Sequence, residues 1–95
     1  MGRIETDAAF FKGLSAFAKR EFSTAAEEFE KAAALNASNP HYYYYLGLTQ
    51  RELGDKISAE KNLSQAVSLL PDAAGIRYVR GEILLENGDS AKAAE

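Results

Sequence analysis

The side chains best suited to chemistry in this 95-residue chain are one histidine and five tyrosines. Four tyrosines are consecutive in the stretch NPHYYYYLG, and His41 directly precedes them. A histidine can act as a general base or a metal ligand, but both roles need partner residues. The chain has no second histidine, no cysteine and no glycine-rich phosphate loop. Tyrosine combines a large rigid face with a polar tip, which suits recognition, so the sequence predicts a non-enzymatic binding protein without cofactors.

The residues around the tyrosines predict that they lie in a helix. Asn39 is a good N-cap, Pro40 suits a first helical turn, and Gly54 is a typical stop. We therefore expect a helix over residues 40–53. Because successive helical residues point about 100° apart, four adjacent tyrosines must face at least two surfaces.

Composition and charge narrow the function further. The net charge is −3 and no basic stripe is present, which argues against a nucleic-acid partner. No apolar run approaches the roughly 20 residues that span a bilayer, and the first residues lack the apolar core of a signal peptide. We expect no membrane association and, by default, a cytoplasmic location.

The chain repeats itself at an interval of 34 residues. Each repeating unit reads as two helices, and the middle of each first helix contains a glycine. A glycine there costs about 1 kcal/mol relative to alanine, which suggests close packing against a small residue of the second helix. The matching triplets are Gly13, Gly47 and Gly81; Ala25, Ala59 and Ala93; and Glu21, Asp55 and Asp89.

The same reading places the remaining helices. We expect helices over residues 6–19, 23–35, 56–70 and from 72 onward, with a turn at 87–89 before a last helix that is cut short. Thr24 and Glu27 fit a capping box, and Glu27 and Lys31 have the spacing of a helical ion pair.

These positions resemble the motif of the tetratricopeptide repeat family, whose units have 34 residues. The third unit departs from the motif at Arg77 and Arg80, where an aromatic residue and a leucine belong. The resemblance implies an all-α fold, a right-handed superhelical stack of antiparallel helix pairs with about two and a half repeats. It also implies one domain over residues 1–95, with repeats at about 6–39, 40–73 and 74–95, the last one truncated. The second unit matches the motif best, at Tyr43, Leu46, Gly47, Ala59, Leu63, Ala66 and Pro71.

The resemblance also implies a function, which is a scaffold that binds a partner peptide or helix in a concave groove. The first helix of each pair lines that groove, with Tyr44 and Tyr45 facing it and Tyr42 and Tyr43 packed between units. Such a groove is aromatic and largely neutral, so we expect a protein or peptide partner with apolar anchors. The implied groove residues are Phe10, Phe11, Leu14, Phe17, His41, Tyr44, Tyr45, Leu48, Arg51, Tyr78 and Glu82.

Three alternatives stay open. The tyrosines can instead fill the core between units. The chain can be a structural or self-assembly segment, because Ile83, Leu84 and Leu85 have little to cover them in a truncated unit. This predicts either a fragment of a longer repeat protein or weak self-association through the C-terminal end. A helical-repeat RNA reader is the third alternative, which the acidic balance and the apolar groove oppose.

Overall fold

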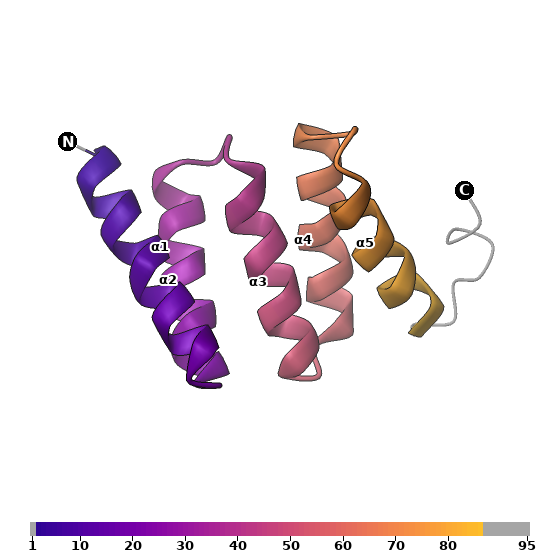
Figure 1. Cartoon of the computed structure of the whole chain (residues 1–95), viewed down its shortest axis with the longest axis horizontal. Coiled ribbons are helices and arrows are strands. Elements are labelled where there is room, and N and C mark those ends of the chain that lie inside the picture. The colour runs from indigo at the N-terminus through magenta and orange to yellow at the C-terminus, as the bar shows by residue number, and fades with distance from the viewer. Residues whose placement is uncertain (1, 87–95) are drawn as a thin grey trace.

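The structure is a computed structural model and describes residues 2–86. All of the regular secondary structure in this range is helical. Figure 1 shows the helices following one another across the molecule. The predicted all-α fold is therefore confirmed. The helices are α1 (Gly2–Ala18), α2 (Phe22–Leu35), α3 (Pro40–Glu52), α4 (Lys56–Leu69) and α5 (Ala74–Glu86).

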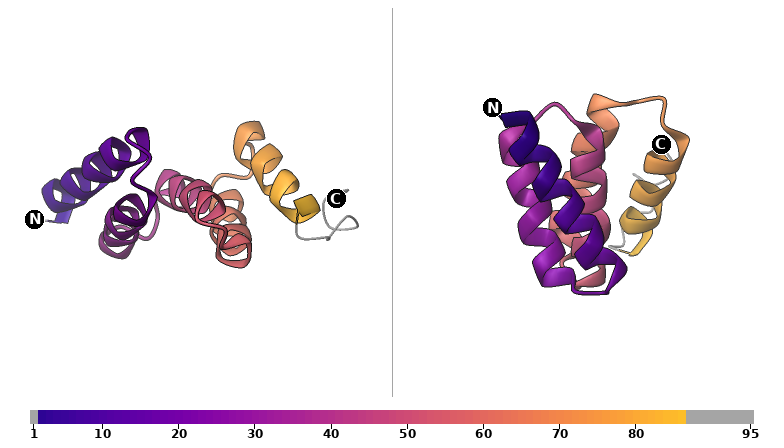
Figure 2. Two further views of the ribbon diagram at one scale, coloured as in Figure 1. Left: turned by 90° about the horizontal axis from the view of Figure 1, so that it is seen from below. Right: turned by 60° about the vertical axis from the view of Figure 1, so that its left-hand side comes forward.

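Each helix packs on its neighbours in the chain, and the contact is larger within the pairs α1–α2 and α3–α4 than from α2 to α3 or from α4 to α5. Viewed roughly along their axes, the helices form a zigzag in which α1 and α5 lie toward one side and α2 lies toward the other (Figure 2). A stack of this kind is held together by contacts between neighbours, so each helix pair depends on the next pair for part of its burial.

The start of α3 confirms the predicted cap. The side-chain oxygen of Asn39 accepts a hydrogen bond of 2.9 Å from the backbone N–H of His41, and Pro40 is in the first turn. At the other end Gly54 has φ +86°, a left-handed conformation that favours glycine. Asp55 then caps α4 by accepting a bond of 3.2 Å from the N–H of Ser58.

The predicted capping box of α2 is wrong. The helix begins at Phe22, so Thr24 lies inside it, and the N-cap residue Glu21 makes no side-chain cap bond. The ring of Phe22, the first residue of α2, packs edge-on against Phe17 near the end of α1, with ring centres 5.4 Å apart. The chain turns at Arg20, whose φ of 64° is positive, and its guanidinium lies 5.3 Å from the Phe22 ring centre.

Lys31 also differs from the prediction, because its partner is another glutamate. Its ammonium group lies 3.3 Å from the carboxylate of Glu28, one turn back, rather than pairing with Glu27. Both spacings bring side chains together on a helix, so the sequence alone could not choose between them.

The core consists of small residues with a few large side chains between them. Phe29 and Leu63 are fully buried at equivalent places in α2 and α4. The three clusters comprise Ala16, Ala25, Ala26, Phe29 and Leu46; Ala9, Ala32, Ala33 and Tyr42; and Ala59, Leu63 and Ile83.

The mid-helix glycines allow the helices of a pair to approach closely, as predicted, but one partner differs. A Cβ at Gly47 would lie 2.7 Å from Cγ of Leu63 and 3.2 Å from the carbonyl oxygen of Ala59, the predicted partner. A Cβ at Gly13 would lie 2.5 Å from the ring of Phe29, so this ring, rather than Ala25, is its nearest neighbour. The third predicted pair joins Gly81 to Ala93, which is outside the described residues.

The expectation that the end of α5 lacks cover is wrong for two of its three apolar residues. Ile83 and Leu84 are buried, and Ile83 belongs to the cluster with Leu63. Ile83 is covered because it packs against Ala59 and Leu63 of α4. Leu85 points elsewhere and is 59% exposed.

Candidate partner-binding face

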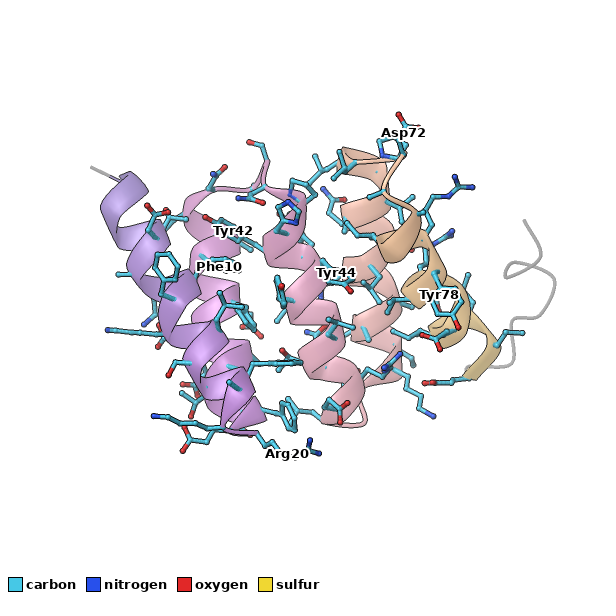
Figure 3. All side chains as sticks on the ribbon, viewed as in Figure 1. Phe10, Arg20, Tyr42, Tyr44, Asp72 and Tyr78 are labelled. Atoms are coloured by element: carbon cyan, nitrogen blue, oxygen red, sulfur yellow. The ribbon has the colours of Figure 1, made fainter. Side chains whose placement is uncertain are left out.

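The four tyrosines divide between the two neighbours of α3. Tyr42 is buried beside Ala32 and Ala33 of α2, and its ring centre lies 4.9 Å from that of Phe10. Figure 3 shows Phe10 and Tyr42 close together on the α1 side of α3, with Tyr44 on the opposite side, toward α5. Tyr43 packs against the same cluster as Tyr42. Both residues therefore pack against the preceding helix pair, as predicted.

Tyr44 and Tyr45, the two tyrosines assigned to the groove, also take part in packing between helices. The ring of Tyr45 stacks on that of Phe29 with centres 5.7 Å apart and meets Phe10 edge-on at 5.7 Å. Tyr44 packs against the cluster that contains Leu63 and Ile83. Both tyrosines are partly buried, so only part of each ring is available to a partner.

The residues assigned to the groove on α1 have unequal exposure. Phe10, Leu14 and Phe17 are partly buried and pack against the cluster around Phe29. Phe11 is 65% exposed. The equivalent residue one unit later is Tyr45, which packs on Phe29 of the preceding helix pair. In the next unit, the position of Phe11 is therefore used for contact between helix pairs.

The residues assigned to α3 and α5 leave more side-chain surface open. Tyr78 is 69% exposed and projects from α5 in Figure 3. Leu48 is partly buried, and His41 is exposed at the first turn of α3. Arg51 of α3 and Glu82 of α5 form an ion pair of 3.5 Å, with 29% and 42% of their side-chain surfaces exposed. This pair connects two helices that are not consecutive in the chain.

An open depression of about 440 Å³ lies along α5 and involves two of the predicted residues, Tyr78 and Glu82. Gly81 contributes to it because no described atom lies within 4 Å of the place where its Cβ would be. Its lining is Arg77, Tyr78, Gly81, Glu82 and Leu85. We call the surface formed by Leu48, Arg51 and this lining the α3–α5 face.

Sequence reasoning missed Arg77 as a member of this face. A signal was present, because a charged side chain stands in the third unit where the repeat motif has an aromatic packing residue. An arginine cannot leave water as readily as an aromatic ring, and here it is exposed. The prediction followed the family's groove positions and so did not include it.

The described residues contain little that would support other chemistry. No three of their His, Asp and Glu side chains gather where they could hold a metal ion. Within residues 2–86, none of the helices has the combined length and apolar character of a membrane span.

Comparison with known proteins identifies the repeat and the fold. Residues 10–59 and residues 51–95 each match the sequence model of the tetratricopeptide repeat. No curated protein sequence matches the chain significantly.

Solved structures with the same fold include three repeat proteins. The Arabidopsis OM64 TPR domain has a TM-score of 0.92 and 20% identity, covering 99% of this chain and 78% of that one. The Yersinia enterocolitica type III secretion chaperone SycD, in complex with a peptide of the translocator YopD, has a TM-score of 0.86 and 16% identity, covering 92% and 66%. MamA from Desulfovibrio magneticus RS-1 has a TM-score of 0.87 and 22% identity, covering 92% and 49%. The chain thus spans between about half and four fifths of these structures.

Proposed function

Since this chain belongs to the tetratricopeptide repeat family, we propose that it is a non-catalytic protein-interaction scaffold that binds a partner peptide or helix. The observation that carries the proposal is the α3–α5 face, where Tyr78 is 69% exposed beside an open depression. We also propose that the units at about 6–39, 40–73 and 74–95 form one domain. The contact of each helix with the next supports this arrangement.

Apolar and aromatic side chains on this face favour an apolar anchor in the partner. Leu48 and Tyr78 come from different helices and both leave surface open. Tyrosine is among the residues that most often dominate binding energy in interfaces, and the leucine adds apolar surface that a partner can bury. The SycD structure contains a bound peptide, which supports peptide binding as a use of this fold.

A selection experiment tests the proposal without a known partner. A displayed library of random peptides is selected on the chain, and enriched peptides are then measured by fluorescence anisotropy against Leu48→Ser and Tyr78→Ser. We expect either variant to weaken binding about tenfold or more, because each removes apolar contact area from the face. Tyr44 is less suitable for such a test, because its ring also packs against the core.

Ile57→Ser is the matched control. Ile57 is 81% exposed at the start of α4, so the substitution removes a comparable apolar side chain from a different helix. Circular dichroism should show the same helical content in all variants. If no peptide is enriched over bare support, or if all three variants bind equally, the proposed function is wrong.

A second candidate function is stacking on further helix pairs, either of a longer chain or of a second copy. Exposed Phe11 favours it, because the equivalent Tyr45 packs on the preceding pair. Light scattering at increasing concentration should then show association that Phe11→Ser removes. A constant monomer mass over the same range would exclude the second copy.

A further inference from the structure

We propose that the segment bound by the α3–α5 face carries a carboxylate side chain beside its apolar anchor, and that Arg51 binds this carboxylate. The inference rests on the proposed function and specifies the partner's chemistry. It concerns an internal aspartate or glutamate of the partner.

The first argument is that Arg51 has unused hydrogen-bonding capacity. A guanidinium has five N–H donors in a planar fork that can hold a carboxylate by two bonds. In the described part of the chain, its only side-chain hydrogen bond is to Glu82, at 3.5 Å, the long end of the hydrogen-bond range. With 29% of its side chain exposed, Arg51 can still be reached from outside.

The second argument is the local balance of charge. Arg51 pairs with Glu82, and Arg77 lines the same depression as Glu82, so the α3–α5 face has two guanidinium groups and one carboxylate. Among the residues of this face, positive charges therefore outnumber negative ones, although the whole chain has a net charge of −3. Complementary charge across an interface favours the matching partner and repels the wrong one, so an acidic residue fits here better than a basic one.

The third argument is the apolar surface next to Arg51. Leu48 is one turn before Arg51 on α3, and Tyr78 and Leu85 flank Glu82 on α5. A partner's apolar side chain on this surface would exclude water from the neighbouring ion pair. Charge-assisted hydrogen bonds strengthen where water is excluded, so the carboxylate and the apolar anchor should be close together in the partner.

The test uses peptides enriched from the same random library, synthesised with amidated C-termini so that only side-chain carboxylates are available. We expect enrichment of Asp or Glu next to a Leu, Phe or other apolar residue. Changing that residue to Asn or Gln should weaken binding to the unmodified chain about tenfold or more. The peptide in which Asn or Gln replaces the acidic residue should bind the unmodified chain and Arg51→Gln with equal affinity.

The matched control is Lys61→Gln, which removes one positive charge from an exposed position on α4. A general charge effect would weaken acidic peptides equally on Lys61→Gln and Arg51→Gln, whereas the proposal requires a loss at Arg51→Gln alone. If Arg51→Gln fails to fold, the unmodified chain still tests whether the partner's carboxylate contributes to binding. Equal affinity for the acidic peptide and for its Asn or Gln version would overturn the inference.

Two results would overturn the inference and leave the proposed function intact. One is enrichment of basic peptides that depend on Glu82, measured with Glu82→Gln. The other is binding of acidic peptides that is equally strong on Arg51→Gln and the unmodified chain. Failure of any peptide to bind is a different result, which removes the proposed function itself.

Discussion

Replacing Gly47 with alanine tests the close packing on which this fold depends. The new Cβ would lie 2.7 Å from Cγ of Leu63 and 3.2 Å from the carbonyl oxygen of Ala59. Neither neighbour can move away easily, because Leu63 is fully buried and the oxygen belongs to the backbone of α4. The substitution must therefore push α3 and α4 apart.

Two opposing effects determine the size of the loss. Alanine gains about 1 kcal/mol over glycine in a helix interior. Overpacking a dense core costs about 1–3 kcal/mol, and the contact with Leu63 places this site toward the upper end. We expect a net loss of about 1–2 kcal/mol, which lowers the Tm of a domain of this size by about 4–16 °C. Thermal unfolding followed by circular dichroism measures this shift.

Gly75→Ala is the control for helix propensity alone. Gly75 is exposed on α5, and a Cβ added to it would have no described atom within 4 Å. The same chemical change should therefore stabilise the protein, by up to about 1 kcal/mol.

A second background isolates the contact itself. Leu63→Ala removes the atom that the new methyl group would meet, so Gly47→Ala should there be neutral or stabilising. Equal destabilisation in both backgrounds, or a stabilising Gly47→Ala in the otherwise unmodified chain, would refute the packing argument.

Two further substitutions separate capping from backbone conformation. Asn39→Ala removes the acceptor of the 2.9 Å bond from the N–H of His41 and should lower the free energy of unfolding by about 1 kcal/mol. A urea titration should show a lower unfolding midpoint, and an unchanged midpoint would mean that the cap contributes nothing. Gly54→Ala should lower the free energy of unfolding by about 1–2 kcal/mol, because φ +86° is strained for alanine. A steric clash is not the cause, since an added Cβ would meet no described neighbour within 4 Å. A neutral result in the same urea titration would show that the turn relaxes to another conformation.

Local sequence features predicted the helices well. An N-cap, a proline in the first turn and a glycine stop define α3 within the chain itself, and the structure gives it nearly the predicted length. The 34-residue interval indicated the helix pairs for a similar reason, because small residues must recur wherever two helices approach closely. The start of α2 was predicted to within one residue, but the predicted capping box was wrong, because Thr24 lies inside the helix and the N-cap residue is Glu21.

The side-chain roles on α3 needed the tertiary structure. Four consecutive tyrosines have the same chemistry, and the helical turn alone tells only that they face different ways. Which of them is buried depends on what the neighbouring helices offer, and the α1 and α2 aromatic rings take up Tyr42 and much of Tyr45.

The sequence by itself thus determined that the chain forms paired helices repeating at one interval, because caps, turns and small residues act over short distances along the chain. The tertiary structure decided which side chains remain available to a partner. The pairing of Arg51 with Glu82 joins α3 to α5 across 31 positions of the sequence, and no local pattern records such a contact. It arises only when α4, which packs on both helices, brings them near enough for two long side chains to meet.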